Sequence, residues 1–228
     1  MIPLRDSVRS RTFPIVNLTI IVLNLIVYFL EVSVEPYQLN QIYYTFGLTP
    51  AEVLNTIFTG ASLTPVLVSF ITAMFIHGGW VHVIGNMLFL WVFGDNVEDR
   101  LGHFKYLLFY LAAGIVGSVA HIMTNPTSTV PVVGASGAVA GVLGAYIIAF
   151  PRSRILALVP IIIIFTLMEI PAVVFIALWF LIQLFNGVAS LGGAANPVAY
   201  WAHVGGFIMG AVLIKIMAPR VAKGYFRP

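Results

Sequence analysis

Apolar stretches long enough to cross a membrane recur along the chain and constrain its fold more than any other feature. A helical crossing of ~30 Å of hydrocarbon takes ~20 mostly apolar residues. Of the 228 residues, 60% are hydrophobic and only 8% are charged, whereas soluble domains carry about a quarter charged residues. These values exclude a soluble globular domain. No polar linker divides the chain, so we expect a single membrane domain over residues 1–228.

The apolar pattern predicts an all-α polytopic membrane protein with six transmembrane helices. The predicted spans are residues 14–31, 80–93, 106–123, 136–150, 171–188 and 200–217. The fourth span is short for a full crossing, which indicates a depression beside it. Residues 155–168 are apolar and rich in β-branched side chains, with Pro160 among them, and we expect an interfacial or strand-like segment there.

Positive charges support this topology, because short cytoplasmic loops collect lysine and arginine. The segments 32–79, 124–135 and 189–199 contain no lysine or arginine. The 11 basic residues fall on the other side or can reach it: Arg5, Arg9, Arg11, Arg100, Lys105, Arg152, Arg154, Lys215, Arg220, Lys223 and Arg227. We therefore expect both termini in the cytoplasm. No small-residue cleavage site follows the first apolar run, so we interpret that run as an uncleaved anchor.

The long outer segment, residues 32–79, is too apolar for a solvated loop and too often interrupted for one further span. Prolines at positions 36, 50 and 65 interrupt it. We expect a membrane-associated structure here, in which residues 66–76 could form a re-entrant helix.

Cysteine content and charge exclude several classes of function. The absence of cysteine rules out disulfides, thiol nucleophiles and thiolate metal sites. The net charge of +3 comes from small basic groups beside apolar runs, which suits lipid head groups better than nucleic acid. We expect a lipid bilayer as a partner, no nucleic acid and no cofactor.

The first candidate for chemistry is Ser136, where an uncharged outer loop meets the start of the fourth span. Its neighbours Gly134, Ala135 and Gly137 are small, so a substrate backbone could approach the hydroxyl. Unpaired amides at a helix N-terminus could receive a developing oxyanion. The alternative is close helix packing, because Gly137 and Gly141 form a GxxxG pair.

His203 and the pair His82 and Asn86 are the other candidates. An ionisable group inside a membrane is costly and points to function, although a histidine bonded to a neighbouring helix is the alternative. Ser136 and His203 both begin their helices from the outer side, so they lie at similar depth and could pair. His82 and Asn86 are four residues apart and share a helix face, from which they could donate to an oxyanion. Their alternative role is to hold helices together.

The remaining titratable residues do not suggest a metal site or a full triad. His77 and His82 are five apart and lack an accompanying acidic residue, which argues against a zinc hydrolase. His103 belongs to a charged inner turn, and His121 is a structural or gating group. No carboxylate is placed behind His203, so we predict a serine–histidine dyad whose imidazole is oriented by packing.

Taken in order, these elements resemble the rhomboid intramembrane serine proteases. The residues that carry the resemblance are the dyad and oxyanion candidates together with segments 77–82 and 94–102. The resemblance implies a six-helix rhomboid-like bundle with a membrane-dipping first loop, and a GxxxG face of the sixth helix packed on the fourth. It implies Ser136 as nucleophile, His203 as general base, and Asn86 and His82 with the Ser136 amide as oxyanion stabilisers. Two positions depart from the pattern: Ala140 stands where some members have an aromatic ring, and Val198 where many have glycine.

The resemblance implies a serine endopeptidase that cuts transmembrane segments of membrane proteins near their outer end through an acyl-enzyme. Helix-destabilising residues in the substrate would lower the cost of unwinding the scissile bond. A catalytically silent relative that binds transmembrane clients is the main alternative, and a small transporter is the third. We expect a prokaryotic cytoplasmic membrane, and the sequence gives no oligomeric state.

Overall fold

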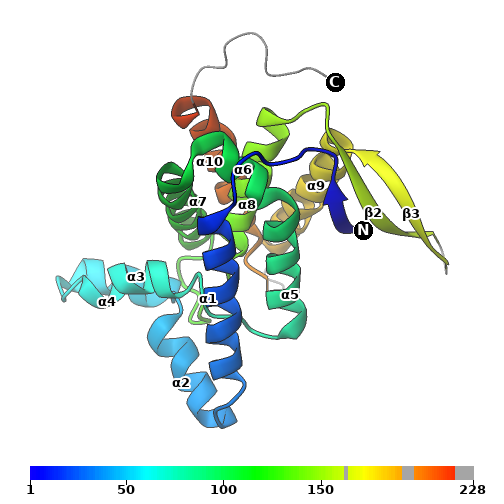
Figure 1. The fold of residues 1–228 in the computed structure, drawn as a ribbon. Coiled ribbons are helices and arrows are strands. Elements are labelled where there is room, and N and C mark those ends of the chain that lie inside the picture. The colour runs from blue at the N-terminus through cyan, green and yellow to red at the C-terminus, as the bar shows by residue number, and fades with distance from the viewer. Residues whose placement is uncertain (162–163, 192–197, 219–228) are drawn as a thin grey trace.

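The computed structural model describes residues 1–161, 164–191 and 198–218 and is mostly helical. The helices are α1 (Ile15–Glu31), α2 (Pro36–Phe46), α3 (Pro50–Thr59), α4 (Thr64–Thr72), α5 (Trp80–Phe89), α6 (Asp95–Leu101), α7 (His103–Thr124), α8 (Ser136–Ala149), α9 (Ala172–Ser190) and α10 (Tyr200–Met217), with the π-helix η1 (Leu90–Gly94) between α5 and α6. The strands are β1 (Ile2–Asp6), β2 (Arg154–Ile161) and β3 (Ile164–Pro171). Figure 1 shows α2–α4 outside the main bundle at one end and the β2–β3 hairpin extending beside α9.

Each of the six predicted spans is helical, and their observed ends lie within a few residues of those expected. Among the described residues, three helices are long and apolar enough to cross a membrane, namely α7, α9 and α10. α1 and α8 are apolar but shorter, and the second span is divided into α5 and η1. The full count of six crossings therefore stays a prediction.

The outer segment folds into the three short helices α2, α3 and α4. A proline stands in the first turn of each, at positions 36, 50 and 65. Proline is tolerated there because its fixed φ suits a helix and its missing N–H would have no partner. The residues that interrupt the apolar pattern thus begin helices. Leu48 and Val53 from this segment pack with Val66, Ala73 and Ile122 in a small core of their own.

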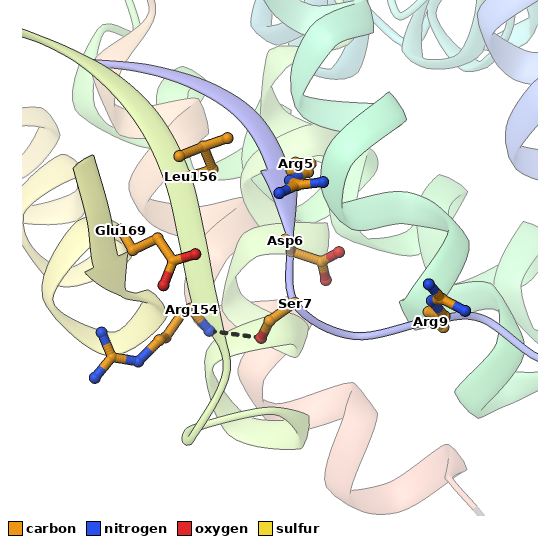
Figure 2. A pocket seen from close by; sticks show the side chains of 7 residues that line it. All are labelled: Arg5, Asp6, Ser7, Arg9, Arg154, Leu156 and Glu169. Carbon is orange, nitrogen blue, oxygen red and sulfur yellow. Dashed lines mark hydrogen bonds between the residues drawn. The ribbon is translucent and has the colours of Figure 1, made fainter. Parts of the chain in front are cut away.

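A three-stranded antiparallel sheet in the order β1-β2-β3 corrects the expectation of an all-α fold. The strand-like expectation for residues 155–168 is confirmed by β2 and β3, apart from residues 162–163, which lie outside the described residues. β1 was not expected. β1 pairs with β2 through Ile2 opposite Leu158 and Asp6 opposite Ile155. At the end of this pairing, the Ser7 hydroxyl accepts a hydrogen bond from the Arg154 N–H at 2.9 Å. That bond lies beside a pocket of about 220 Å³, and Figure 2 shows the bond and the side chains that line the pocket.

The start of α1 is fixed to the bundle by residues of segment 94–102. The fully buried carboxylate of Glu98 accepts hydrogen bonds from the N–H groups of Val16, at 3.0 Å, and Asn17, at 2.7 Å. These donors have no acceptor within the helix, and a carboxylate favours the positive end of the helix dipole. A Cβ at Gly94 would lie 2.1 Å from the Asn17 side chain. The charged segment therefore anchors the first helix.

The contact between α8 and α10 is made by glycines at backbone distance. A Cβ on Gly206 would lie 2.0 Å from the carbonyl oxygen of Gly137, and one on Gly210 would lie 1.9 Å from that of Gly141. Neither position has space for a larger residue. This confirms the expected packing of the GxxxG face of the sixth helix on the fourth. α8 itself is enclosed, since every residue from Gly137 to Tyr146 is buried.

Candidate active site

Ser136 is the first residue of α8 and follows a tight turn. Gly134 in that turn has φ +123°, a conformation that favours glycine. Its N–H donates to the carbonyl of Ala73 at 2.8 Å, and a Cβ there would lie 2.5 Å from Cε1 of His82. The turn thus brings the His82 ring close to the loop that leads into α8. Ser136 is half-buried, so its hydroxyl is held by the helix without being enclosed.

His203 lies in the first turn of α10, with 8% of its surface exposed. Its Nε2 is 2.8 Å from the Oγ of Ser136. The expected contact between these side chains is therefore present. It follows from the glycine packing described above, because Gly137 and Gly206 stand next to Ser136 and close to His203 on the two facing helices.

The other ring nitrogen of His203, Nδ1, is 2.8 Å from Oε1 of Gln183 in α9. The rings of Trp179 and Tyr200 lie 6.0 Å and 6.2 Å from the imidazole, centre to centre. Sequence reasoning left the support of His203 to packing and missed Gln183. The signal was available, because Gln183 is an amide within an apolar span, where polar side chains require partners.

Asn86 and His82 lie on α5, and the structure gives Asn86 a partner that the sequence did not suggest. Within the described residues, the Asn86 amide is 3.0 Å from Nε2 of His77. The same His77 nitrogen lies 3.5 Å from the backbone nitrogen of Ala135. The His77 and His82 rings are 5.1 Å apart, centre to centre. His77, which sequence reasoning left out of the site, therefore connects Asn86 to the start of α8.

His77 is fully buried in the turn before α5. Burial lowers the pKa of its imidazole to about 3, because the charged form loses hydration. The neutral ring can accept from Asn86 at Nε2 when its proton is on Nδ1. Its backbone N–H donates to both carboxylate oxygens of Glu31 at 3.2 Å. The end of α1 thus helps to position the turn that carries His77.

His103 and His121 make no hydrogen bond to this cluster within the described residues. His103 bonds the buried Glu98 through Nδ1 at the start of α7, which gives it a definite anchoring partner. His121 lies near the end of α7, and its Nδ1 is buried without a partner in the described part of the chain. No group of three or more His, Cys, Asp or Glu residues within the described ranges is arranged to hold a metal ion.

Residues 65–220, more than half of the chain, match the family model described as the rhomboid domain. The chain belongs to the rhomboid family. The match begins in α4 and includes the helices that carry Asn86, Ser136, Gln183 and His203. Together with the apolar helices, membership makes this rhomboid an integral membrane protein.

Three curated relatives illustrate the family. The rhomboid is 45% identical to "Rhomboid protease GluP" of Bacillus subtilis over 75 residues, which are 33% of this chain and 14% of that protein. It is 30% identical to "RHOMBOID-like protein 5" of Arabidopsis thaliana over 158 residues, or 69% of this chain and 46% of that protein. For "Rhomboid protein 1, mitochondrial" of Saccharomyces cerevisiae the identity is 30% over 149 residues, or 64% and 40%.

In each case the match covers less than half of the relative's length. The relatives come from bacteria, a plant and a fungal mitochondrion, so they do not support the expected prokaryotic location of this rhomboid.

Proposed function

We propose that this rhomboid is a serine endopeptidase acting within the membrane, with Ser136 as nucleophile and His203 as general base. The single observation that supports this most directly is the 2.8 Å separation of Ser136 Oγ and His203 Nε2. That distance lies within the range required for proton transfer between a nucleophile and its base. The half-exposed hydroxyl at the start of α8 leaves a substrate carbonyl a route of approach.

In the proposed reaction, Ser136 Oγ attacks the scissile carbonyl carbon while its proton passes to His203 Nε2. The tetrahedral intermediate then expels the amine, which takes that proton from His203, and leaves an acyl-enzyme. A water molecule, deprotonated by the same nitrogen, attacks the ester and releases the acid and Ser136. The mechanism requires His203 to be neutral and unprotonated at Nε2 when the hydroxyl attacks.

The developing oxyanion would be met by N–H groups at the start of α8, which lack acceptors within the helix. Asn86 and His82 are the proposed side-chain donors. In the free protein, the hydrogen bond to His77 would hold the Asn86 amide in place. When substrate is bound, this amide would turn toward the oxyanion.

We also propose six crossings, with both ends of the described chain on the cytoplasmic side. The contacts that support this arrangement join segments predicted to be cytoplasmic: Thr12 bonds Asp99 at 2.7 Å, and Lys105 bonds the Met217 carbonyl at 3.2 Å. Substrates would be transmembrane proteins whose helices enter beside α8 and unwind locally before cleavage.

The test is to treat purified protein with a fluorophosphonate probe and, in parallel, with a panel of membrane-anchored reporters. Wild type should be labelled at Ser136, with loss of fluoride from the probe, and should cut at least one reporter. Ser136→Ala should abolish both signals, while Ser128→Ala, in the loop before α8, should retain them. Labelling and turnover that survive in Ser136→Ala would contradict the nucleophile assignment. A folded wild type with neither signal would favour the silent relative.

A further inference from the structure

Gln183 occupies an unusual position, because it is an amide in the middle of the apolar helix α9. Its neighbours Leu181, Ile182, Leu184 and Phe185 are all apolar. The amide is half-buried, and its Oε1 is 2.8 Å from Nδ1 of His203. Polar groups in a membrane helix need internal partners, since lipid offers none. The partner of this amide is the imidazole of the proposed base.

The atoms in this contact fix the direction of both hydrogen bonds made by His203. An amide oxygen can only accept, so Nδ1 must carry the proton that it donates to Gln183. A neutral imidazole holds one proton, which leaves the lone pair of Nε2 directed at the Ser136 hydroxyl, 2.8 Å away. This is the tautomer that a general base for Ser136 requires.

Other groups around His203 cannot fix that tautomer. The rings of Trp179 and Tyr200, 6.0 Å and 6.2 Å away between centres, restrict the imidazole by packing only. Within the described residues, the side chains hydrogen-bonded to the ring of His203 are Gln183 and Ser136. An uncharged amide thus stands where serine proteases with a triad use a carboxylate.

We propose that Gln183 is a positioning residue for His203, holding the imidazole in its Nδ1–H tautomer and aiming Nε2 at Ser136. The proposal rests on the proposed function for its kinetic consequence, but its structural claim concerns His203 alone. Gln183 contacts no reacting atom, so it acts on the rate of acylation and leaves substrate binding unchanged.

Two substitutions separate hydrogen bonding from packing. Gln183→Met keeps the length of the side chain and removes the acceptor, whereas Gln183→Glu keeps an oxygen at the same reach. Gln41→Met, on the exposed side of α2, is the matched control. Reporter cleavage by Gln183→Met should show kcat lower by about 10-fold to 100-fold with KM changed less than about 3-fold, since part of the general-base contribution is lost. Gln183→Glu should regain most of the rate, and Gln41→Met should match wild type.

A second measurement does not depend on activity. Histidine-selective ¹⁵N labelling of Ser136→Ala protein reports the tautomer of each imidazole by NMR, and the resonance lost on adding His203→Gln identifies His203. We expect the Nδ1–H form with Gln183 or Glu at position 183, and loss of that preference with Met. Equal populations of both tautomers, or the Nε2–H form, in protein that retains Gln183 would overturn the proposal even if Gln183→Met fails to fold.

The outcomes also distinguish this proposal from the proposed function. If wild type neither cleaves nor labels but His203 is in the Nδ1–H form, the proposed function fails and the positioning role stands. If wild type is active and Gln183→Met has unchanged kcat and tautomer, the positioning role fails alone.

Discussion

Gly134 has a positive φ, which residues with a Cβ rarely adopt, and the ring of His82 leaves no space for a side chain at this position. Its φ is +123°, and a Cβ would lie 2.5 Å from Cε1 of His82. Gly134→Ala should therefore displace the turn before Ser136 and lower reporter turnover by on the order of 10-fold to 100-fold, the scale for small misplacements of reacting groups. Gly60→Ala is the control, because Gly60 also has positive φ, +68°, but open space around it. Equal turnover in both variants would refute the argument.

The proposed role of Asn86 leads to a second prediction about a single residue. Asn86→Ala should reduce kcat by about 100-fold or more without abolishing turnover, which is the scale of loss on removing one oxyanion donor, while Ser136 still reacts with the fluorophosphonate. Reporter kinetics and probe labelling measured side by side would check this. An unchanged kcat would assign Asn86 to packing through His77.

Individual residues were predicted unevenly. The contact between Ser136 and His203 could be predicted because small neighbours and an intramembrane imidazole are visible in the sequence. Gln183 is visible as a polar residue in an apolar span, but the partners of Gln183 and His77 could not be predicted, since they depend on which helix each residue faces. For example, Gln183 and His203 are 20 positions apart, and this spacing does not reveal that the amide of α9 faces α10.

At the scale of elements, the glycine contact between α8 and α10 predicts that a glycine substitution in the contact destabilises the protein far more than one outside it. Gly206→Ala places a methyl group 2.0 Å from the Gly137 carbonyl oxygen, so the helices must separate. We expect a loss of about 1–3 kcal/mol in the free energy of unfolding, typical of overpacking, together with lower turnover. Thermal unfolding in detergent would measure it.

The matched control is Gly85→Ala on α5, where a Cβ would meet nothing within 4 Å. It should leave stability equal or slightly higher, because alanine favours helix more than glycine does. If Gly206→Ala were as stable as Gly85→Ala, α8 and α10 could move apart at little cost, which would contradict the prediction.

Elements with a strong apolar signal were the most predictable. The positions of the six predicted helical spans follow from runs of apolar residues, which the structure reproduces as helices. Only part of the sheet could be predicted from the sequence, because β1 pairs with β2, which lies about 150 residues later in the chain. Pairing over such a distance leaves no local pattern in residues 2–6.

At the scale of the whole molecule, Asp6 joins the N-terminal strand to the bundle. Its carboxylate accepts hydrogen bonds from the Tyr146 hydroxyl of α8 and from Asn96 of α6, the latter at 2.9 Å. Burial raises the pKa of Asp6 from 3.8 to about 7, although the Tyr146 bond opposes the shift. The folded protein therefore binds more protons here than the unfolded chain between pH 4 and pH 7.

The sign of the pH dependence follows from this difference. The contribution of Asp6 to stability is fully present below pH 4 and is lost as the pH rises through 7. The unfolding temperature of the wild type in detergent, taken relative to that of Asp6→Asn, should therefore fall between pH 5 and pH 8. Glu52→Gln, on an exposed position of α3, should leave the slope as in wild type. Parallel slopes for wild type and Asp6→Asn would contradict the assignment.

Ser136 and His203 are 67 positions apart in the chain, and this separation also sets an order during synthesis. The ribosome delivers α8 long before α10, so a nascent chain contains the hydroxyl without its proton acceptor. Only the docking of α10 through Gly206 and Gly210 completes the pair. A polypeptide stalled before this step would carry the proposed nucleophile without the proposed base.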